Sequence, residues 1–151
     1  MTKFTADSKN RLLELLEEKL KLFGTVREYT ERHAKLIAED SFEALLSSTQ
    51  DRQDAITKIN GLHQESNVLM QSYMSFVNSG GKKIPEIESA DQRLTDIMSE
   101  CAGLNEKNMK TLKEKMKDQS EKSEKMRQSR ESLGLYAQGG SNSAELFDEL
   151  R

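Results

Sequence analysis

The chain has 151 residues, with one proline, eight glycines, no tryptophan and a single cysteine. Hydrophobic residues make up 34% of it and charged residues 32%, which is lean for a wide globular core but suits elongated helices with narrow apolar faces. Cys101 has no partner within the chain, which excludes a disulfide scaffold. The net charge of −3 gives no reason to expect a general nucleic-acid-binding protein.

Two observations bear on the compartment of the protein. No apolar run approaches the roughly 20 residues that cross a bilayer. The N-terminal stretch lacks the apolar core of a signal peptide. We therefore expect a cytoplasmic protein without membrane insertion, whose single thiol stays reduced.

The first predicted helix covers about residues 8–38. Its apolar side chains recur at alternating steps of three and four, which places them on one narrow, coiled-coil-like face. Arg27 occupies one position of this face. The other positions are Leu13, Leu16, Leu20, Phe23, Thr30, Ala34 and Ile37. The stretch from Asp40 to Glu43 has the form of a capping box, which predicts the start of the next helix.

The second predicted helix covers residues 41–78 and follows the same spacing, with Arg52 and Ser66 as polar exceptions. It ends at Gly80 and Gly81, a typical helix stop. The repeat positions are Phe42, Leu45, Thr49, Ile56, Ile59, His63, Met70, Tyr73 and Val77.

The third predicted helix covers residues 86–132, because Pro85 suits a first helical turn. Its apolar face begins with Ile87, Ala90, Leu94, Ile97, Cys101 and Leu104. The repeat then places Asn108 where an apolar side chain is expected, so the face shifts by one residue around 105–109. A helix of this length measures about 70 Å. We therefore expect its far end, rich in lysine and methionine, to overhang the other two helices.

The predicted architecture is all-α: an elongated antiparallel three-helix bundle over residues 1–132. A flexible tail follows over 133–151, because glycines and small polar residues dominate its first half. Near its end, Leu146, Phe147 and Leu150 form a short amphipathic segment that is too short to be stable alone.

The sequence gives little support for catalysis. His33 and His63 lie thirty positions apart and match no metal-binding pair. His63 and Cys101 fall on apolar faces, which favours packing roles over ligand or nucleophile roles. The stretch Gly80 to Lys83 lacks the frame of a phosphate-binding loop. We expect a protein that is not an enzyme and that needs no metal and no cofactor.

Residues 107–130 carry nine basic and four acidic side chains. The basic side chains spread around the helix without interleaved aromatic residues, which favours a solvated helix over a nucleic-acid-binding surface. Met116 and Met126 lie on the shifted face of the predicted overhang. Flexible thioethers suit a surface that adapts to a partner helix, so we predict partner binding there.

Three stretches resemble the FlgN-type flagellar export chaperones, bacterial chaperones of hook-associated proteins. Residues 104–112 (LNEKNMKTL) are similar to the LNxxNxxxL segment of the family's last long helix. Residues 135–140 (LYAQGG) are similar to its tail motif, a tyrosine closely followed by glycine. Residues 49–59 (TQDRQDAITKI) resemble the second-helix pattern of charged residues around aliphatic ones.

The resemblance implies a cytoplasmic chaperone of flagellar type III export. Such a protein binds the C-terminal helical segments of hook-associated proteins, prevents their premature assembly and delivers them to the cytoplasmic domain of the export gate. The family motif places Asn105 and Asn108 in the cargo-binding helix and gives Tyr136 the export-gate docking role.

The residues themselves extend this site. A polar Asn108 in an apolar face specifies register at a cost in stability, and an incompletely packed helix can accept a cargo helix in its groove. The predicted cargo-binding residues are Asn105, Asn108, Met109, Leu112, Met116 and Met126. The alternatives are a structural coiled-coil adaptor without an export role and, less favoured, a nucleic-acid-binding helical protein; a monomer and a homodimer are both compatible with the pattern.

Overall fold

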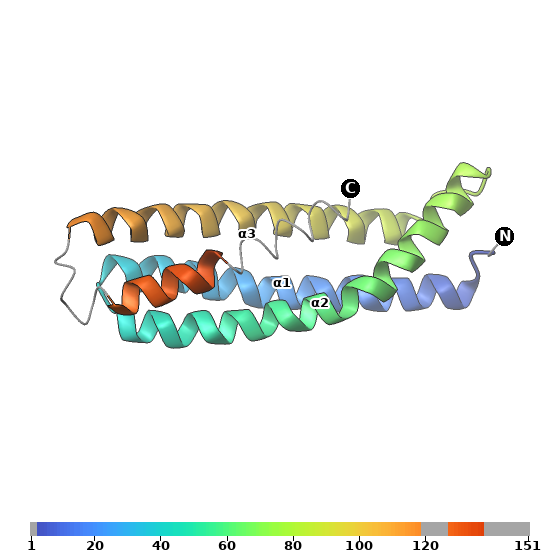
Figure 1. Cartoon of the computed structure of the whole chain (residues 1–151). Helices are drawn as coiled ribbons and strands as arrows, with labels where there is room; N and C mark the ends of the chain where they lie inside the picture. The colour runs from blue at the N-terminus through green and yellow to red at the C-terminus, as the bar shows by residue number, and fades with distance from the viewer. Residues whose placement is uncertain (1–2, 119–126, 138–151) are drawn as a thin grey trace.

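The computed structural model describes residues 3–118 and 127–137, and every secondary-structure element in them is a helix (Figure 1). The elements are α1 (Ala6–Ala38), α2 (Phe42–Asn78) and α3 (Pro85–Asp118), followed by a helix over residues 127–137. The predicted all-α bundle is confirmed. None of the described helices combines the length and apolar character that a membrane crossing requires.

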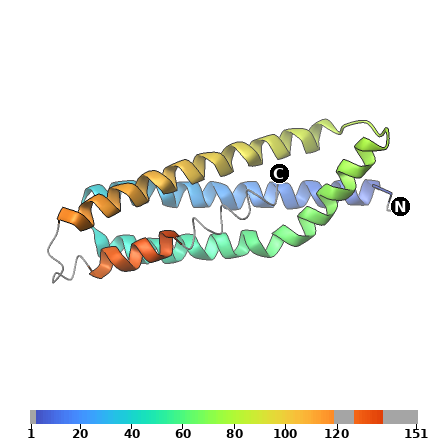
Figure 2. The ribbon, with the colours of Figure 1, turned by 45° about the horizontal axis from the view of Figure 1, so that its top comes forward.

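Helix α1 is the centre of the bundle. It packs along both α2 and α3, whereas the described parts of α2 and α3 have no comparable backbone contact with each other. Figures 1 and 2 show the three helices lengthwise side by side, with the later half of α2 crossing toward the start of α3. Because α1 faces two partners, it has to bury two adjacent stripes of side chains rather than one.

The predicted apolar face of α1 therefore captures only part of what is buried. Ala34 is exposed and Leu13 is only half-buried, although both were expected on the face. The second stripe, which the simple repeat misses, contains two groups that ionise, Lys19 and His33. The buried residues of α1 are Leu12, Leu15, Leu16, Lys19, Phe23, Val26, Thr30, His33 and Ile37.

In α2 the predicted repeat has the correct register. The two polar exceptions, Arg52 and Ser66, are both 2% exposed and lie among the apolar residues of the core. The helix ends at Asn78, two residues before Gly80, whose φ of 100° is favourable for glycine alone. Tyr73 then closes the turn to α3, since its hydroxyl donates to Glu88 Oε1 (3.0 Å) and accepts from the Ile84 amide (2.9 Å).

The predicted capping box at Asp40–Glu43 does not form, because Asp40 belongs to the end of α1. Its φ of 56° is left-handed, and the following Ser41 amide donates to the Leu36 carbonyl (2.9 Å). This pattern closes a helix C-terminus. Ser41 is the N-cap of α2, but its side chain makes no capping hydrogen bond.

The buried face of α3 runs through Leu94, Met98, Cys101, Asn105 and Asn108 to Leu112 without a break. The step of four residues from Leu94 to Met98, where the simple repeat expects three, moves the face earlier than predicted. Both asparagines are therefore regular members of the buried face.

The chain beyond Asp118 differs from the expected overhang. The described helix over residues 127–137 runs back along the bundle, antiparallel to α3 (Figures 1 and 2). Within it, Leu133 is half-buried and Tyr136 is 0% exposed. Positions 133–137 thus belong to the packed structure and not to a flexible tail. The predicted amphipathic segment at Leu146–Leu150 lies outside the described residues.

The bundle contains two apolar clusters. The larger one joins α1, α2 and α3 and includes Leu16, Phe23, Ile59, Leu94 and Met98. The smaller one lies at the end where the helix over residues 127–137 packs, and its buried members are Ile37, Phe42, Leu45, Leu112 and Tyr136. Between them lies a polar layer, formed by Thr30, His33, Ser48, Arg52, Asn105 and Asn108, all of them buried.

Lys115 on α3 holds the C-terminus of α1. Its ammonium donates to the carbonyls of Ile37 (2.6 Å) and Ala38 (3.4 Å) and pairs with Asp40 Oδ1 at 2.5 Å. A cation at this position also interacts favourably with the helix dipole. Lys115 thereby fixes the angle at which the last turns of α3 meet the α1–α2 connection.

We predict that Lys115→Met lowers the free energy of unfolding by about 1–3 kcal/mol, because hydrogen bonds from a charged donor contribute that much. Chemical denaturation of both proteins measures the difference. Lys113→Met is the matched control, since Lys113 is exposed on the same helix. Equal losses in the two variants would contradict a specific role for Lys115.

Candidate functional site

The predicted cargo-binding residues are mostly turned into the bundle. Asn105 is 6%, Asn108 4% and Leu112 0% exposed. Met109 and Met116 are half-buried, and Met109 packs against the smaller apolar cluster. Met126 lies outside the described residues. The bundle in this arrangement therefore presents only the edges of the predicted cargo surface.

Tyr136 is the residue that covers this region. Its ring lies over the Arg52 guanidinium, with the Arg52 Cζ atom 5.2 Å from the ring centroid. The His33 ring meets it edge-on at 5.3 Å and 82°. Burial raises the pKa of the Tyr136 hydroxyl above its usual range, with the Arg52 charge acting against this. The sequence suggested two separate sites, the cargo-binding residues of α3 and the docking residue Tyr136. In the structure they lie in the same region of the bundle.

Arg52 is a buried cation at the centre of the polar layer. Its Nε donates to Thr30 Oγ1 at 2.9 Å, and within residues 3–118 and 127–137 it forms no ion pair. Burial lowers the pKa of the guanidinium below its ordinary value, but an arginine remains charged. Among the described residues, the groups that compensate the charge are the hydroxyl of Thr30 and the face of Tyr136.

Thr30 and Asn108 connect this cation to α1 and α3. Asn108 Nδ2 donates to the Thr30 carbonyl at 2.8 Å. The Thr30 hydroxyl accepts from Arg52 and donates to the Val26 carbonyl at 2.7 Å. A single residue of α1 therefore joins polar side chains of both neighbouring helices, which fixes the register of the three helices at this level.

His33 lies beneath Tyr136 with no exposed surface. Its Nε2 and the Ser48 hydroxyl are 2.7 Å apart. Burial, and secondarily the Arg52 charge, lowers the pKa of His33 to about 4. The ring is therefore neutral near pH 7, which suits its contact with an aromatic edge.

Sequence reasoning gave neither His33 nor Arg52 a role in the site. The sequence shows Arg52 as a polar residue within the apolar repeat of α2. The repeat does not indicate whether such a residue is buried. His33 follows Val26 and Thr30 at helical spacing, which is the signal for the second buried stripe of α1. That stripe becomes meaningful only once α1 is known to have two neighbours.

Lys19 is a second buried cation, on the same stripe of α1. Its ammonium lies 3.4 Å from His63 Nδ1, and burial lowers its pKa to about 8. It has no ion pair among the described residues. Cys101 is buried as predicted, and burial raises the pKa of its thiol to about 11. A thiol in that state is a poor nucleophile at neutral pH.

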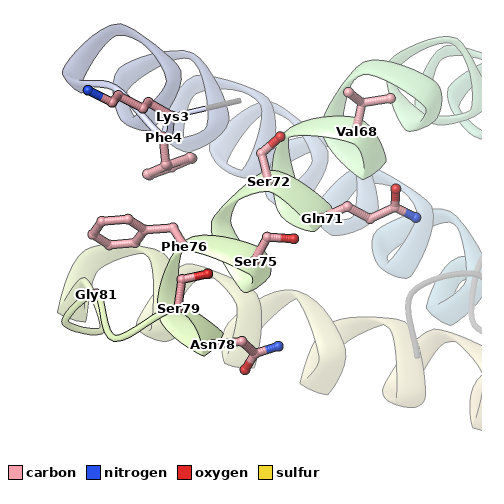
Figure 3. Close-up of a pocket in the computed structure, with 10 residues that line it drawn as sticks. All are labelled: Lys3, Phe4, Val68, Gln71, Ser72, Ser75, Phe76, Asn78, Ser79 and Gly81. Carbon is pink, nitrogen blue, oxygen red and sulfur yellow. The ribbon is translucent and has the colours of Figure 1, made fainter. Parts of the chain in front are cut away.

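A shallow groove of about 750 Å³ lies at the opposite end of the bundle. Figure 3 shows Phe4 pointing toward Phe76 on the last turns of α2, with Val68 pointing outward and Phe76 beside Gly81. Val68 and Met74 nearby are 57% and 53% exposed. The groove brings together hydroxyl, amide and apolar groups but only one charged side chain, Lys3. It offers packing surface rather than a reactive site.

No three His, Cys, Asp or Glu side chains in the described parts of the chain gather as they do around a metal ion. The chemistry that the polar layer does offer is recognition: a buried guanidinium, two amides and an imidazole between two apolar surfaces. The region is thus a site of packing and hydrogen bonding between helices of the bundle.

We predict that acid destabilises the protein in part through His33. Its pKa of about 4 in the folded state lies below the value of about 6.5 in the unfolded chain, so the unfolded state takes up the proton first. Stability is therefore lost as the pH falls from about 6.5 toward 4, by about 2 kcal/mol between pH 7 and 5. His33→Gln removes this contribution, whereas His63→Gln retains it. Chemical denaturation at pH 5 and pH 7 measures the loss of unfolding free energy in each protein. An equal loss in the wild type and in His33→Gln would refute the assignment.

The comparisons with known proteins agree with this geometry. The family model described as FlgN protein matches residues 1–144, nearly the whole chain. Neither the curated proteins nor the solved structures contain a significant match. The match covers all three long helices and the helix that carries Tyr136. The chain therefore belongs to the FlgN family, the family of flagellar export chaperones.

Proposed function

We propose that this chain is a cytoplasmic chaperone that binds the C-terminal helical segments of hook-associated flagellar proteins, keeps them unassembled and delivers them to the export gate. The observation that carries the proposal is the FlgN match over residues 1–144. The elongated helical bundle supports it, because a long helical surface suits a helical cargo segment.

The proposed cargo surface is the end of the bundle around α3. It consists of Asn105, Asn108, Met109, Leu112, Met116 and Met126. The half-buried Met109 and Met116 mark its accessible edge, and flexible thioethers adapt to different apolar partners. Binding there shields cargo surfaces that otherwise pair with other subunits. This mechanism is masking and needs neither catalysis nor a cofactor.

Delivery requires a second contact, and we assign it to Tyr136. Its ring is 0% exposed against Arg52 and His33. A gate protein therefore reaches it only after the helix over residues 127–137 leaves the bundle. That helix has eleven described residues and contains Gly134, which makes it weak when isolated. Its undocking thus converts a buried anchor into an accessible motif.

The first test is direct binding. The full-length chain should bind purified C-terminal helical fragments of the hook-associated proteins from the same organism, measured by titration calorimetry. Fragments from the central regions of the same proteins are the controls and should not bind. If no C-terminal fragment binds at concentrations up to about 100 μM, the chaperone assignment fails and the structural adaptor becomes the better hypothesis.

The second test separates the two partners. Tyr136→Ala should retain cargo binding but lose most binding to the cytoplasmic domain of the export gate, because it removes the aromatic anchor of the docking motif. Leu135→Ala, a half-buried neighbour on the same helix, is the matched control and should keep both activities. Loss of cargo binding in Tyr136→Ala would show that the tail is not a separate docking element.

A further inference from the structure

The contact between the helix over residues 127–137 and the polar layer is incompletely satisfied. Three buried side-chain atoms there have no hydrogen-bond partner among the described residues. One belongs to the helix itself, Ser132 Oγ. The other two, His33 Nδ1 and Asn105 Oδ1, belong to the layer beneath it. Buried polar groups in native proteins are normally paired, so a cluster of exceptions indicates a contact adapted to more than one occupant.

Arg52 shows what kind of occupant is missing. Its guanidinium is 2% exposed, yet it has no carboxylate partner in the described parts of the chain. The Thr30 hydroxyl takes one of its five N–H donors, and the Tyr136 ring covers its face without accepting a conventional hydrogen bond. A carboxylate is the group whose planar pair of oxygens fits a guanidinium best. Charge complementarity therefore points to an acidic side chain at the position of Tyr136.

The surroundings define the rest of the partner. Leu133 and Tyr136, one turn apart, pack into the apolar cluster that includes Phe42, Leu45 and Leu112. An incoming segment that replaces them needs apolar side chains at the same helical spacing. Since Gly134 weakens the resident helix, a better helix former with a carboxylate competes effectively. The fit is thus to an amphipathic helix with one acidic residue within its apolar face.

We propose that the helix over residues 127–137 occupies the binding site of a partner helix. When the partner helix binds, it displaces Tyr136, and one of its carboxylates pairs with Arg52. This inference rests on the proposed function, because the partner helix is the C-terminal segment of a cargo protein. It adds the displaced element, the recognition residue and the chemistry of the group recognised.

The first experiment replaces Arg52 by methionine in the full chain and measures binding of the C-terminal cargo fragments. Loss of one partner from a buried, hydrogen-bonded ion pair should weaken binding about 30-fold or more. Folding should survive, because methionine fills similar volume and removes an unpaired buried charge; denaturation of the free variant checks this. Arg27→Met is the matched control, since Arg27 forms a partly exposed pair with Glu100 and should leave binding unchanged.

The sign of the Arg52→Met effect is itself discriminating. The substitution also removes the contact between Arg52 and Tyr136 that keeps the helix over residues 127–137 packed. If cargo displaced this helix without pairing a carboxylate with Arg52, the variant would bind cargo more tightly. Unchanged or tighter binding therefore overturns the carboxylate pairing. Changing each acidic residue of the fragment to its amide, one at a time, identifies the residue that pairs with Arg52. One such change should weaken the fragment's binding to the wild type but have little further effect on its binding to Arg52→Met.

The second experiment tests displacement without altering Arg52. Ser47 and Gln128 line the same small groove, so cysteines at both positions, in a Cys101→Ser background, allow a short bifunctional cross-linker to tie the helix to α2. Cross-linking should reduce cargo binding at least about tenfold, and the same protein before cross-linking should bind like the wild type. Equal binding by the tied and untied forms overturns the displacement.

The outcomes separate this inference from the proposed function. If the wild type binds no C-terminal fragment, the proposed function itself fails. If it binds them but neither Arg52→Met nor the cross-link weakens binding, the function stands and this inference fails. If the untied protein instead forms dimers that compete with cargo binding, the place is held for a second copy of this chain and the inference is overturned as well.

Discussion

The polar layer is organised around a buried guanidinium that has no carboxylate beside it among the residues that the structure describes. Arg52 lies in the interface between helices, 2% exposed, and in the described part of the chain it is stabilised by the Thr30 hydroxyl and the face of Tyr136. Withdrawing a charge from water costs several kcal/mol, and a cation–π contact returns about 2 kcal/mol of it when desolvated. This imbalance leaves a net desolvation cost at the end of the bundle around Arg52. Tyr136, Asn108 and His33 are arranged around it.

The polar layer divides the bundle into ends of different character. Toward the N-terminus, apolar side chains of three helices pack together, and Phe4, Tyr73 and Phe76 close that end with aromatic contacts. On the other side of the layer, a smaller cluster relies on Tyr136 for its cover. Local opening starts where apolar contacts are few and polar groups are unsatisfied. Local opening is therefore expected first at the end where the family motifs lie.

Much of the fold was predictable from residues alone. Helix spacing, Gly80 as a stop and Pro85 as a start all correspond to the structure, because they depend on local chemistry. The two stripes of α1 did not follow from the sequence, since they depend on how many neighbours a helix has. The return of residues 127–137 was also hidden, because Leu133 and Tyr136 carry too small an apolar signal to indicate where a short helix packs. Burial of Arg52 is a tertiary property that no repeat reports.

The same limit explains why the candidate site appeared as two sites. Sequence motifs separated Asn105 and Asn108 on α3 from Tyr136 by about thirty residues, so independent roles were the natural interpretation. In the structure Tyr136 and Asn108 both approach the Arg52–Thr30 pair, one through its ring and the other through a hydrogen bond to the Thr30 carbonyl. Any ligand that displaces one of them alters the environment of the other. Under the proposed function, in which the chain holds one partner and then meets another, the shared buried cation couples the two events through electrostatics.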